Sequence, residues 1–207
     1  MAQVTSGIRS ILSTPWVYDL SQELLGASGS RRKVCAQHLR VQPGQRVVDV
    51  GCGTAELLRF LPPDIRYHGF DLDAGYIDAA RERHGDRGTF TCADVTQVPP
   101  DAIPPCDVAV AFGVLHHLDD DGARALLDHL LDRLVPGGRI VTIDPAWQEG
   151  QSPIARALIA RDRGQNVRDG ESYRALFPAR AAERKLVVRH DLLRIPYTHA
   201  IVECART

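Results

Sequence analysis

Short apolar runs that alternate with helical segments constrain the fold of this chain more than any other feature of its sequence. The runs lie at residues 46–50, 67–72, 89–93, 107–112 and 139–144, and segments with helix signals separate several of them. Such alternation predicts a mostly parallel sheet with helices on both faces. In such sheets ligands bind beyond the carboxyl ends of the strands, so the residues that follow each run form the candidate site.

Capping residues and helix breakers bound the expected helices. Ser30 is expected to cap the second helix and Asp73 the fourth, because their side-chain oxygens can accept hydrogen bonds from the first turn. Ser152 followed by Pro153 predicts the start of a further short helix, which Gly164 ends. The other elements are expected as helices at 16–26, 31–40, 55–61, 74–84 and 121–134, a looser segment at 145–177, and closing strands at 185–191 and 199–205.

The overall composition is that of one ordinary globular domain. A chain of 207 residues is long enough for one core and short for two. A net charge of −1 argues against a protein that binds nucleic acid through bulk charge. No apolar run approaches the roughly 18 residues that span a bilayer, and no signal peptide is evident. The five scattered cysteines favour a reduced, cytoplasmic protein. From the charge and the short apolar runs we expect no nucleic-acid or membrane partner, and the oligomeric state stays open.

The first apolar run ends in a glycine-rich loop. Gly51 and Gly53 let the backbone turn tightly and approach a ligand closely. A dinucleotide-binding loop needs a third glycine, where this chain has Glu56. Glu56 and Asp49 would repel a phosphate, so the loop favours a ligand that has positive groups and no phosphate. S-adenosylmethionine (SAM) carries an ammonium and a sulfonium and meets that requirement. The alternative is a turn that needs glycine for structural reasons alone.

Acidic residues follow the next two runs. Asp71 is twenty residues beyond Gly51, where an acid can accept both hydroxyls of an adenosine ribose. Asp73 directly precedes a helix and is the better helix cap. Asp94, after the third run, could accept from the exocyclic amine of adenine, although an aspartate before a loop is common in any case.

Two adjacent histidines, His116 and His117, follow the fourth run. At a strand end they are candidates for acid–base chemistry. A metal site with Asp119, Asp120 and Asp121 is disfavoured, because adjacent residues point in different directions and the aspartates suit a helix start. We therefore expect no metal. A purely structural role for both histidines stays open.

These segments, taken in order, resemble the class I SAM-dependent methyltransferases, specifically the branch that acts on small molecules. VVDVGCGTA is similar to the glycine-rich motif of that family, GFDLD to its ribose-binding motif and ADV to its adenine-side motif. DVAVAFGVLHHLDD and RLVPGGRIVTIDP resemble the motifs around its fourth and fifth strands. The resemblance covers residues 46–145, and it departs mildly at Ala55, where many members have glycine.

The resemblance implies a Rossmann-like fold and a set of cofactor contacts. The fold is a mostly parallel seven-stranded sheet with an antiparallel edge hairpin and helices on both faces. The expected single domain, 1–207, has an N-terminal helical lid at 1–42 and a variable acceptor-side segment at 145–180. The implied contacts are Asp49, Gly51, Cys52 and Gly53 to the methionine part of SAM, Asp71 to the ribose, Leu72, Asp94 and Val95 to adenine, and Phe112 and Gly113 beneath the methionine part and the sulfonium.

The expected reaction is an in-line displacement that leaves S-adenosylhomocysteine. Because the methyl donor is already activated, proximity and orientation can supply most of the rate. A base is needed when the acceptor is a hydroxyl, an acidic carbon or an ammonium. We predict His117 as that base, with His116 as the second candidate.

The acceptor site is expected in the variable parts of the chain. Arg156, Arg163 and Arg168 could bind a carboxylate or phosphate on the acceptor, unless they form a solvated face paired with nearby acids. Tyr173 could also reach the acceptor. Trp16 and Tyr18 could cover the site, although ordinary hydrophobic packing explains them as well.

Three other functions compete with methyl transfer to a small molecule. An NAD(P)-linked oxidoreductase conflicts with Glu56 in the glycine loop. A nucleic-acid methyltransferase conflicts with the absence of an N-P-P-Y element and of a basic appendage. A protein that binds SAM without methyl transfer stays open, because cofactor motifs do not report on the final step.

Overall fold

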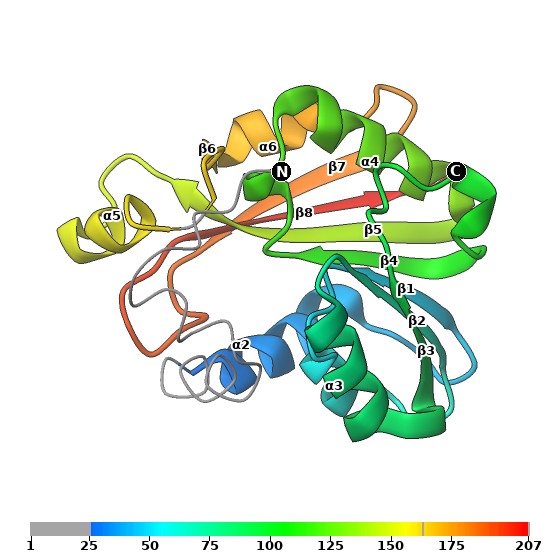
Figure 1. Ribbon diagram of the computed structural model, residues 1–207. Helices are drawn as coiled ribbons and strands as arrows, with labels where there is room; N and C mark the ends of the chain where they lie inside the picture. Colours follow the sequence, from blue (N-terminus) through cyan, green and yellow to red (C-terminus); the bar gives the residue numbers. More distant parts are fainter. Residues whose placement is uncertain (1–25, 163, 207) are drawn as a thin grey trace.

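The computed structural model describes residues 26–162 and 164–206. A twisted β-sheet forms the centre of this part of the chain (Figure 1). Its seven main strands lie in the order β3-β2-β1-β4-β5-β8-β7. The strands β3 to β5 are parallel, and β8 is antiparallel to both β5 and β7. The predicted seven-stranded sheet with an antiparallel edge hairpin is therefore confirmed. The strands are β1 Arg46–Val50, β2 Arg66–Asp71, β3 Gly88–Cys92, β4 Cys106–Phe112, β5 Leu134–Trp147, β7 Ala182–Arg189 and β8 His199–Ala205, with a short β6, Arg168–Asp169, beside the end of β5.

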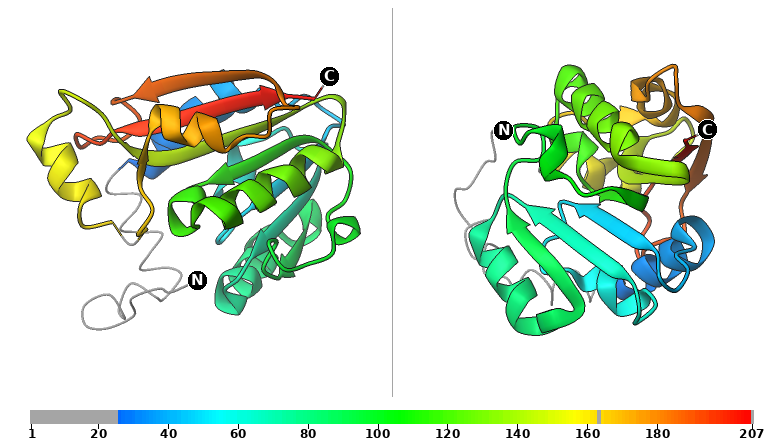
Figure 2. Two further views of the ribbon diagram at one scale, coloured as in Figure 1. Left: turned by 90° about the horizontal axis from the view of Figure 1, so that it is seen from above. Right: turned by 90° about the vertical axis from the view of Figure 1, so that its right-hand side faces the viewer.

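Helices cover both faces of the sheet (Figure 2). The helices α4 and α6 lie on one face, and α2 and α3 lie on the other. Within the described ranges, no helix combines the length and the apolar character needed to cross a membrane. The α-helices are α2 Ala27–Val34, α3 Ala74–His84, α4 Asp120–Arg133, α5 Pro153–Ile159 and α6 Gly170–Leu176, and the shorter helical turns are η2 Cys35–Leu39, η3 Glu56–Phe60, η4 Gly85–Arg87, η5 Pro100–Ala102 and η6 Leu115–His117.

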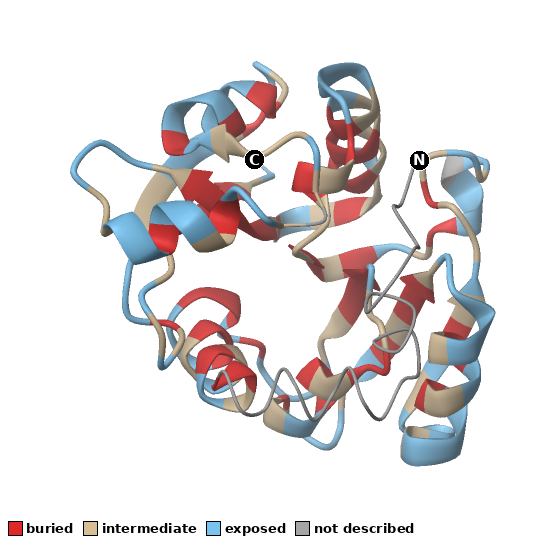
Figure 3. Ribbon diagram, turned by 60° about the vertical axis from the view of Figure 1, so that its left-hand side comes forward, coloured by how far each residue is buried: buried red, intermediate tan, exposed pale blue. Residues whose placement is uncertain are grey.

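The core consists of two apolar layers, one on each side of the sheet (Figure 3). Successive side chains of a strand point to opposite faces, so Val47 packs in one layer and Val48 in the other. The helix predicted at 121–134 has leucines at helical spacing, which predicts one apolar face, and in α4 these leucines are buried in the layer that contains Val48. Strands buried on both faces explain why the sequence shows continuous apolar runs rather than strict alternation.

The helix predicted at 31–40 begins earlier and ends differently. Gly26 adopts a left-handed conformation with φ of 89°, and α2 starts directly after it. Ser30 therefore lies inside the helix, buried, with its backbone N–H bonded to the Gly26 carbonyl at 3.0 Å. The prediction that Ser30 caps this helix is wrong. The helix begins four residues earlier, where the left-handed backbone of Gly26 turns the chain without a side-chain cap. The helix predicted at 16–26 lies outside the described residues, apart from its last residue.

The helix predicted at 55–61 is a short 3-10 helix, η3. Ala55 precedes it with φ of 57°, a left-handed conformation that is unfavourable for residues other than glycine. Pro62 and Pro63 then follow and stop further helix growth. With both ends fixed in this way, the segment is too short for a regular α-helix.

The acceptor-side segment contains more regular structure than predicted. The helix α5 begins as expected, with the Ser152 hydroxyl accepting from the Ile154 N–H at 3.3 Å. It ends at Ile159 rather than at Gly164. The short strand β6 and the helix α6 then follow in what we expected to be loose chain. At the other end of β5, the strand starts at Leu134, five residues before the predicted 139.

Candidate active site

The carboxyl ends of the central strands bring the predicted cofactor residues to one edge of the sheet. Val50 at the end of β1 is in register with Phe70 of β2 on one side and with Ala111 of β4 on the other. The loops that follow these three strands therefore begin side by side. Because parallel strands point the same way, residues far apart in the sequence meet here.

The glycine loop after β1 is shaped by positive backbone angles. Gly51 has φ of 69°, and a Cβ built on it would lie 2.5 Å from the Val114 Cγ2 atom. Gly53 has φ of 55°, and a Cβ there would meet no described atom within 4 Å. Gly51 thus permits close packing against the loop after β4, whereas Gly53 faces open space. That space fits a ligand which approaches the backbone.

Asp71 connects the end of β2 to this loop. Its Oδ2 atom accepts from the Gly53 N–H at 2.8 Å, and its Oδ1 atom accepts from the Asp73 N–H at 3.0 Å. A carboxylate oxygen has more than one acceptor site, so both oxygens can still receive a ribose hydroxyl. Asp73 instead caps α3 by accepting from the Gly75 and Tyr76 N–H groups. The predicted helix cap at Asp73 is therefore confirmed.

Asp49 is a buried carboxyl group directly before the loop. It is 2% exposed and accepts a hydrogen bond from the Tyr67 hydroxyl at 2.5 Å. Burial raises the pKa of Asp49 to about 7, although the Tyr67 hydrogen bond lowers it in part. A cationic ligand at this edge would favour the ionised form.

This raised pKa makes the stability of the ligand-free protein depend on pH. The folded pKa of Asp49 is above the unfolded value near 4, so its contribution is present at acid pH and is lost as the pH rises to about 7. We expect Asp49→Asn to remove a loss of about 2 kcal/mol between pH 5 and pH 7. Urea unfolding at several pH values measures this difference, and an unchanged slope in the variant would contradict it.

Glu56, which was expected to repel a phosphate, is paired with two arginines instead. Its carboxylate pairs with Arg59 at 2.8 Å and also with Arg83. Burial alone would raise the pKa of Glu56, but the two arginines lower it below its usual value. The negative character of the loop therefore comes from Asp49 and Asp71 rather than from Glu56.

The residues predicted to contact adenine have mixed environments. Leu72 is 47% exposed just beyond β2, which leaves its side chain accessible to a planar ring. The Asp94 Oδ1 atom accepts from both the backbone N–H and the hydroxyl of Thr96, at 2.9 and 2.6 Å. Val95 is buried in the core. Asp94 thus forms a local turn, and Val95 fixes that turn to the core.

The other cofactor residues are Cys52, Phe112 and Gly113. Cys52 is half-buried, and its thiol pKa is raised by burial, which keeps it uncharged. Gly113 has φ of 71°, and its N–H donates to the Ile143 carbonyl at 2.7 Å, which joins the end of β4 to β5. Phe112 is half-buried at the end of β4. All three lie at the same edge as Gly51 and Asp71.

The two histidines occupy different environments on η6. His116 is 5% exposed, and its Nδ1 and Nε2 atoms lie 2.8 Å from Asp144 and 3.2 Å from Asp162. Burial lowers the pKa of His116, but the two carboxylates outweigh that effect and raise it to about 9. His117 is half-buried, with its ring 4.0 Å from the His116 ring between centroids. His116 is thus held as an imidazolium, so at neutral pH its geometry favours positioning over proton abstraction.

Of the residues predicted to bind the acceptor, the structure describes Arg156, Arg168 and Tyr173, and the Arg168 guanidinium lies 5.6 Å from the centre of the Tyr173 ring. Every side-chain nitrogen of Arg168 is bonded, to Asp120 or to the carbonyls of Leu115, Leu118 and Asn166. Tyr173 is 1% exposed and donates to the Pro145 carbonyl at 3.0 Å. The exposed Arg156 stacks over the Trp147 ring at 5.5 Å. Trp16, Tyr18 and Arg163 lie outside the described residues.

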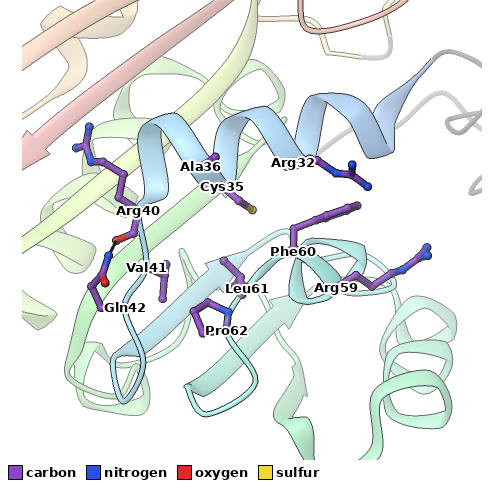
Figure 4. Close-up of a pocket in the computed structure, with 10 residues that line it drawn as sticks. All are labelled: Arg32, Cys35, Ala36, Arg40, Val41, Gln42, Arg59, Phe60, Leu61 and Pro62. Carbon is purple, nitrogen blue, oxygen red and sulfur yellow. Dashed lines mark hydrogen bonds between the residues drawn. The ribbon is translucent and has the colours of Figure 1, made fainter.

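Two surface cavities lie in the described part of the chain. A cavity of about 680 Å³ lies between η2 and η3 and includes Arg32, Arg59 and Phe60 in its wall (Figure 4). None of the predicted site residues that the structure describes lines it. A smaller cavity of about 200 Å³ lies between the start of α5 and the chain before β8, lined by Gly150, Gln151, Ser152, Ala155, His190, Pro196, Tyr197 and Thr198.

Sequence reasoning missed the partners of His116. Asp144 follows the pattern of a carboxylate at a strand end and could have been found by the same logic as Asp49. Asp162 and Tyr197 lie in irregular chain, where no pattern marks them.

In sequence and in fold, the chain is similar to known methyltransferases. A family model described as "Methyltransferase domain" matches residues 48–140. The chain is 29% identical over 176 residues to a ubiquinone/menaquinone biosynthesis C-methyltransferase UbiE of Xanthomonas oryzae, a match that covers 77% of this chain and 68% of that protein. The UbiE of Stenotrophomonas maltophilia is 30% identical over 115 residues, covering 50% of this chain and 46% of that protein.

Solved structures share the fold at low sequence identity. The pyocyanin biosynthetic protein PhzM superposes with a TM-score of 0.72 at 19% identity, covering 93% of this chain and 58% of that one. Human N-acetylserotonin methyltransferase, solved in complex with SAM, gives 0.70 at 17% identity, with coverage of 93% and 54%. The chain thus spans little more than half of these structures. The predicted resemblance to the class I SAM-dependent methyltransferases is confirmed.

Proposed function

We propose that this chain transfers a methyl group from SAM to a small-molecule acceptor by in-line displacement. The observation that carries the proposal is the bond between Asp71 and the Gly53 N–H, beside a backbone that faces open space. It joins an acceptor for ribose hydroxyls to a loop that a methionine chain can approach. Titration with SAM, S-adenosylhomocysteine and NADH tests this step, and tight binding of NADH alone would contradict it.

Different residues at the carboxyl ends of the strands bind different parts of the cofactor. Asp49, Gly51, Cys52 and Gly53 border the methionine part, and Asp71 holds the ribose. Leu72, Asp94 and Val95 contact adenine through an exposed apolar side chain and a fixed turn. Phe112 and Gly113 form the floor next to the sulfonium.

The chemistry needs alignment more than activation. SAM supplies a methyl group that is already activated by the positive sulfur. The chain orients the acceptor and excludes water, and it removes a proton where the acceptor carries one. We assign that proton transfer to His117, because His116 already binds carboxylates through both ring nitrogens.

Substitution of His117 tests this assignment. We expect His117→Ala to lower kcat about a hundredfold with a hydroxyl or acidic-carbon acceptor, since general base catalysis contributes about that factor. Binding of S-adenosylhomocysteine should change little. Unchanged turnover at saturating SAM would remove His117 from the mechanism.

The acceptor is proposed to be a neutral molecule with hydrogen-bonding groups. The anionic acceptor suggested by the three arginines gains no support from Arg168, whose nitrogens are committed to backbone carbonyls and Asp120. The smaller cavity instead presents uncharged donors and acceptors on Gln151, Ser152 and Thr198. It can receive part of such an acceptor.

The relatives suggest where to begin a search for the acceptor. Several are named C-methyltransferases of ubiquinone and menaquinone biosynthesis. A panel should therefore start with electron-rich aromatic rings and extend to hydroxyl and amine acceptors. Product detection by mass spectrometry identifies the methylated atom. Binding of SAM without a product across the panel would favour a SAM-binding protein that does not transfer methyl groups.

The proposal keeps residues 1–207 as one domain. Residues 145–180 form its acceptor side, and residues 1–42 are assigned to the cover of the site. A cytoplasmic location and the absence of nucleic-acid partners accompany this assignment as expectations.

A further inference from the structure

His116 lies at the centre of a buried charged cluster that joins two distant parts of the chain. The cluster consists of His116 on η6, Asp144 on β5, and Asp162 and Tyr197 in the chain after α5 and before β8. Asp144 is 1% exposed and contacts the His116 ring and, at 3.2 Å, its backbone N–H. Asp162 contacts the opposite ring nitrogen at 3.2 Å. One imidazolium therefore bridges a carboxylate of the sheet and a carboxylate of the acceptor-side segment.

Asp162 is bound from three directions. Besides His116, it accepts from the Tyr197 hydroxyl and from the Gly164 N–H, both at 2.9 Å. Burial alone would raise the pKa of Asp162, but the bonds with His116 and these donors hold it well below its usual range. Asp162 thus stays ionised, and the bridge to His116 is an ion pair with little competition from water.

The chain after Asp162 packs closely against the same histidine. A Cβ on Gly164 would lie 1.9 Å from the His116 Cδ2 atom and 2.7 Å from its carbonyl oxygen. The Asn166 N–H donates to that carbonyl at 2.9 Å. These contacts are independent of the ion pair, and they require glycine at position 164. The segment of residues 160–162 and 164–168 therefore contacts both the side chain and the backbone of His116.

Arg168 completes the attachment at the far end of this segment. It binds the carbonyls of Leu115 and Leu118, the residues on either side of the histidine pair. By contrast, α5, which precedes the segment, is largely exposed and projects from the body of the molecule (Figure 1). Residues 160–162 and 164–167 form no helix or strand, so contacts with η6 hold this part of the segment.

We propose that His116 is a positioning residue that fixes the segment of residues 160–162 and 164–168 to the catalytic edge through paired bonds to Asp144 and Asp162. The inference rests on the proposed function in that it takes this segment to border the acceptor. With His116 in place, His117 and the acceptor side of the site keep fixed positions relative to the end of β4. Without it, the buried Asp144 and the partly buried Asp162 would lose the cation between them.

The charge of His116 sets the pH range over which the attachment holds. Asp144 and Asp162 contact the His116 ring, the His117 ring lies 4.0 Å from it, and His199 is close enough for their charges to interact. Tyr197 and Arg168 contact neighbours of His116, the Asp162 carboxylate and the Leu115 carbonyl. Burial lowers the pKa of His199 to about 4 and raises that of Tyr197, so both stay uncharged near pH 9. The pKa of His116 is raised to about 9. Its contribution is complete below the ordinary value near 6.5 and is lost as the pH rises through about 9.

Asp162→Asn tests the proposal, with Asp169→Asn as the matched control. Asp169 lies in the same part of the chain and caps α6, a role that asparagine performs equally well. In Asp162→Asn, we expect the amides of Gly164 and Asn166 to exchange hydrogen about tenfold faster. The His116 ring, followed by NMR, should titrate at least about one unit lower. The control should change neither quantity.

Two further measurements separate this inference from the proposed function. In the unsubstituted protein, protection of the Gly164 and Asn166 amides should fall above pH 9 after correction for the intrinsic rate of exchange. The Kd of S-adenosylhomocysteine should stay within about twofold in Asp162→Asn. An absence of S-adenosylhomocysteine binding in the unsubstituted protein overturns the proposed function alone. Unchanged exchange and an unchanged His116 titration in Asp162→Asn overturn the positioning role.

Discussion

Replacement of Asp71 with alanine is expected to weaken binding of S-adenosylhomocysteine about a thousandfold. The substitution removes a carboxylate that can accept two ribose hydroxyls, and each hydrogen bond to a charged group contributes about 1.5–3 kcal/mol. It also removes the acceptor of the Gly53 N–H, which holds the glycine loop against β2. Both losses act on the same ligand, so the effect on binding is large. Isothermal titration calorimetry measures it directly.

Asp73→Ala is the control for this prediction. Asp73 is two residues away and caps α3, so its loss should lower the free energy of unfolding by about 1 kcal/mol. Its side chain has no assigned ligand contact, and the Kd should change by less than about threefold. Equal losses of affinity in the two variants would show that Asp71 acts through local structure rather than through the ribose.

The substitution Gly51→Ala is expected to lower the free energy of unfolding by about 3 kcal/mol. A left-handed conformation costs a non-glycine residue about 1–2 kcal/mol. The added Cβ would also lie 2.5 Å from the Val114 Cγ2 atom, and overpacking of this kind costs about 1–3 kcal/mol. Val114 is β-branched and has few rotamers in which to move aside. Denaturant unfolding, followed by circular dichroism, measures the change.

Gly53→Ala separates the structural role of the loop from its binding role. Gly53 has a similar positive φ, but a Cβ there would meet no described atom within 4 Å. We expect a loss of about 1 kcal/mol in stability, from the backbone alone. The affinity for S-adenosylhomocysteine should nevertheless fall at least about tenfold, because the methyl group would occupy the space assigned to the methionine chain. Normal affinity in Gly53→Ala would place the ligand elsewhere.

Much of the fold could be predicted because its signals are local. The run at 107–112 differs by one residue from β4, and 199–205 coincides with β8. The leucines of α4 have a helical spacing, and they are buried as expected. The less regular elements escaped prediction. The start of α2 depends on the left-handed backbone of Gly26. The start of η3 depends on the left-handed backbone of Ala55, which could not be predicted because alanine rarely adopts this conformation.

The sequence also predicted which residues lie at the carboxyl ends of the strands, whereas it did not predict the contacts on the acceptor side. Asp71 and the two glycines could be assigned because they directly follow strands. The expected roles of Arg168 and Tyr173 did not account for where those side chains point. Arg168 contacts backbone carbonyls of η6, and Tyr173 is buried against β5. Sequence spacing on a helix face does not reveal such partners, because they come from other elements.

The sequence by itself determined the order of strands and helices and the edge where the site lies. It did so because apolar runs, glycines and caps act on their immediate neighbours, and parallel strands necessarily bring their carboxyl ends together. Only the tertiary structure decided which of the two histidines is held between two carboxylates. His116 meets Asp144 across 28 residues and Asp162 through irregular chain. Packing between elements, rather than any local pattern, places those charges side by side and fixes the protonation of the ring.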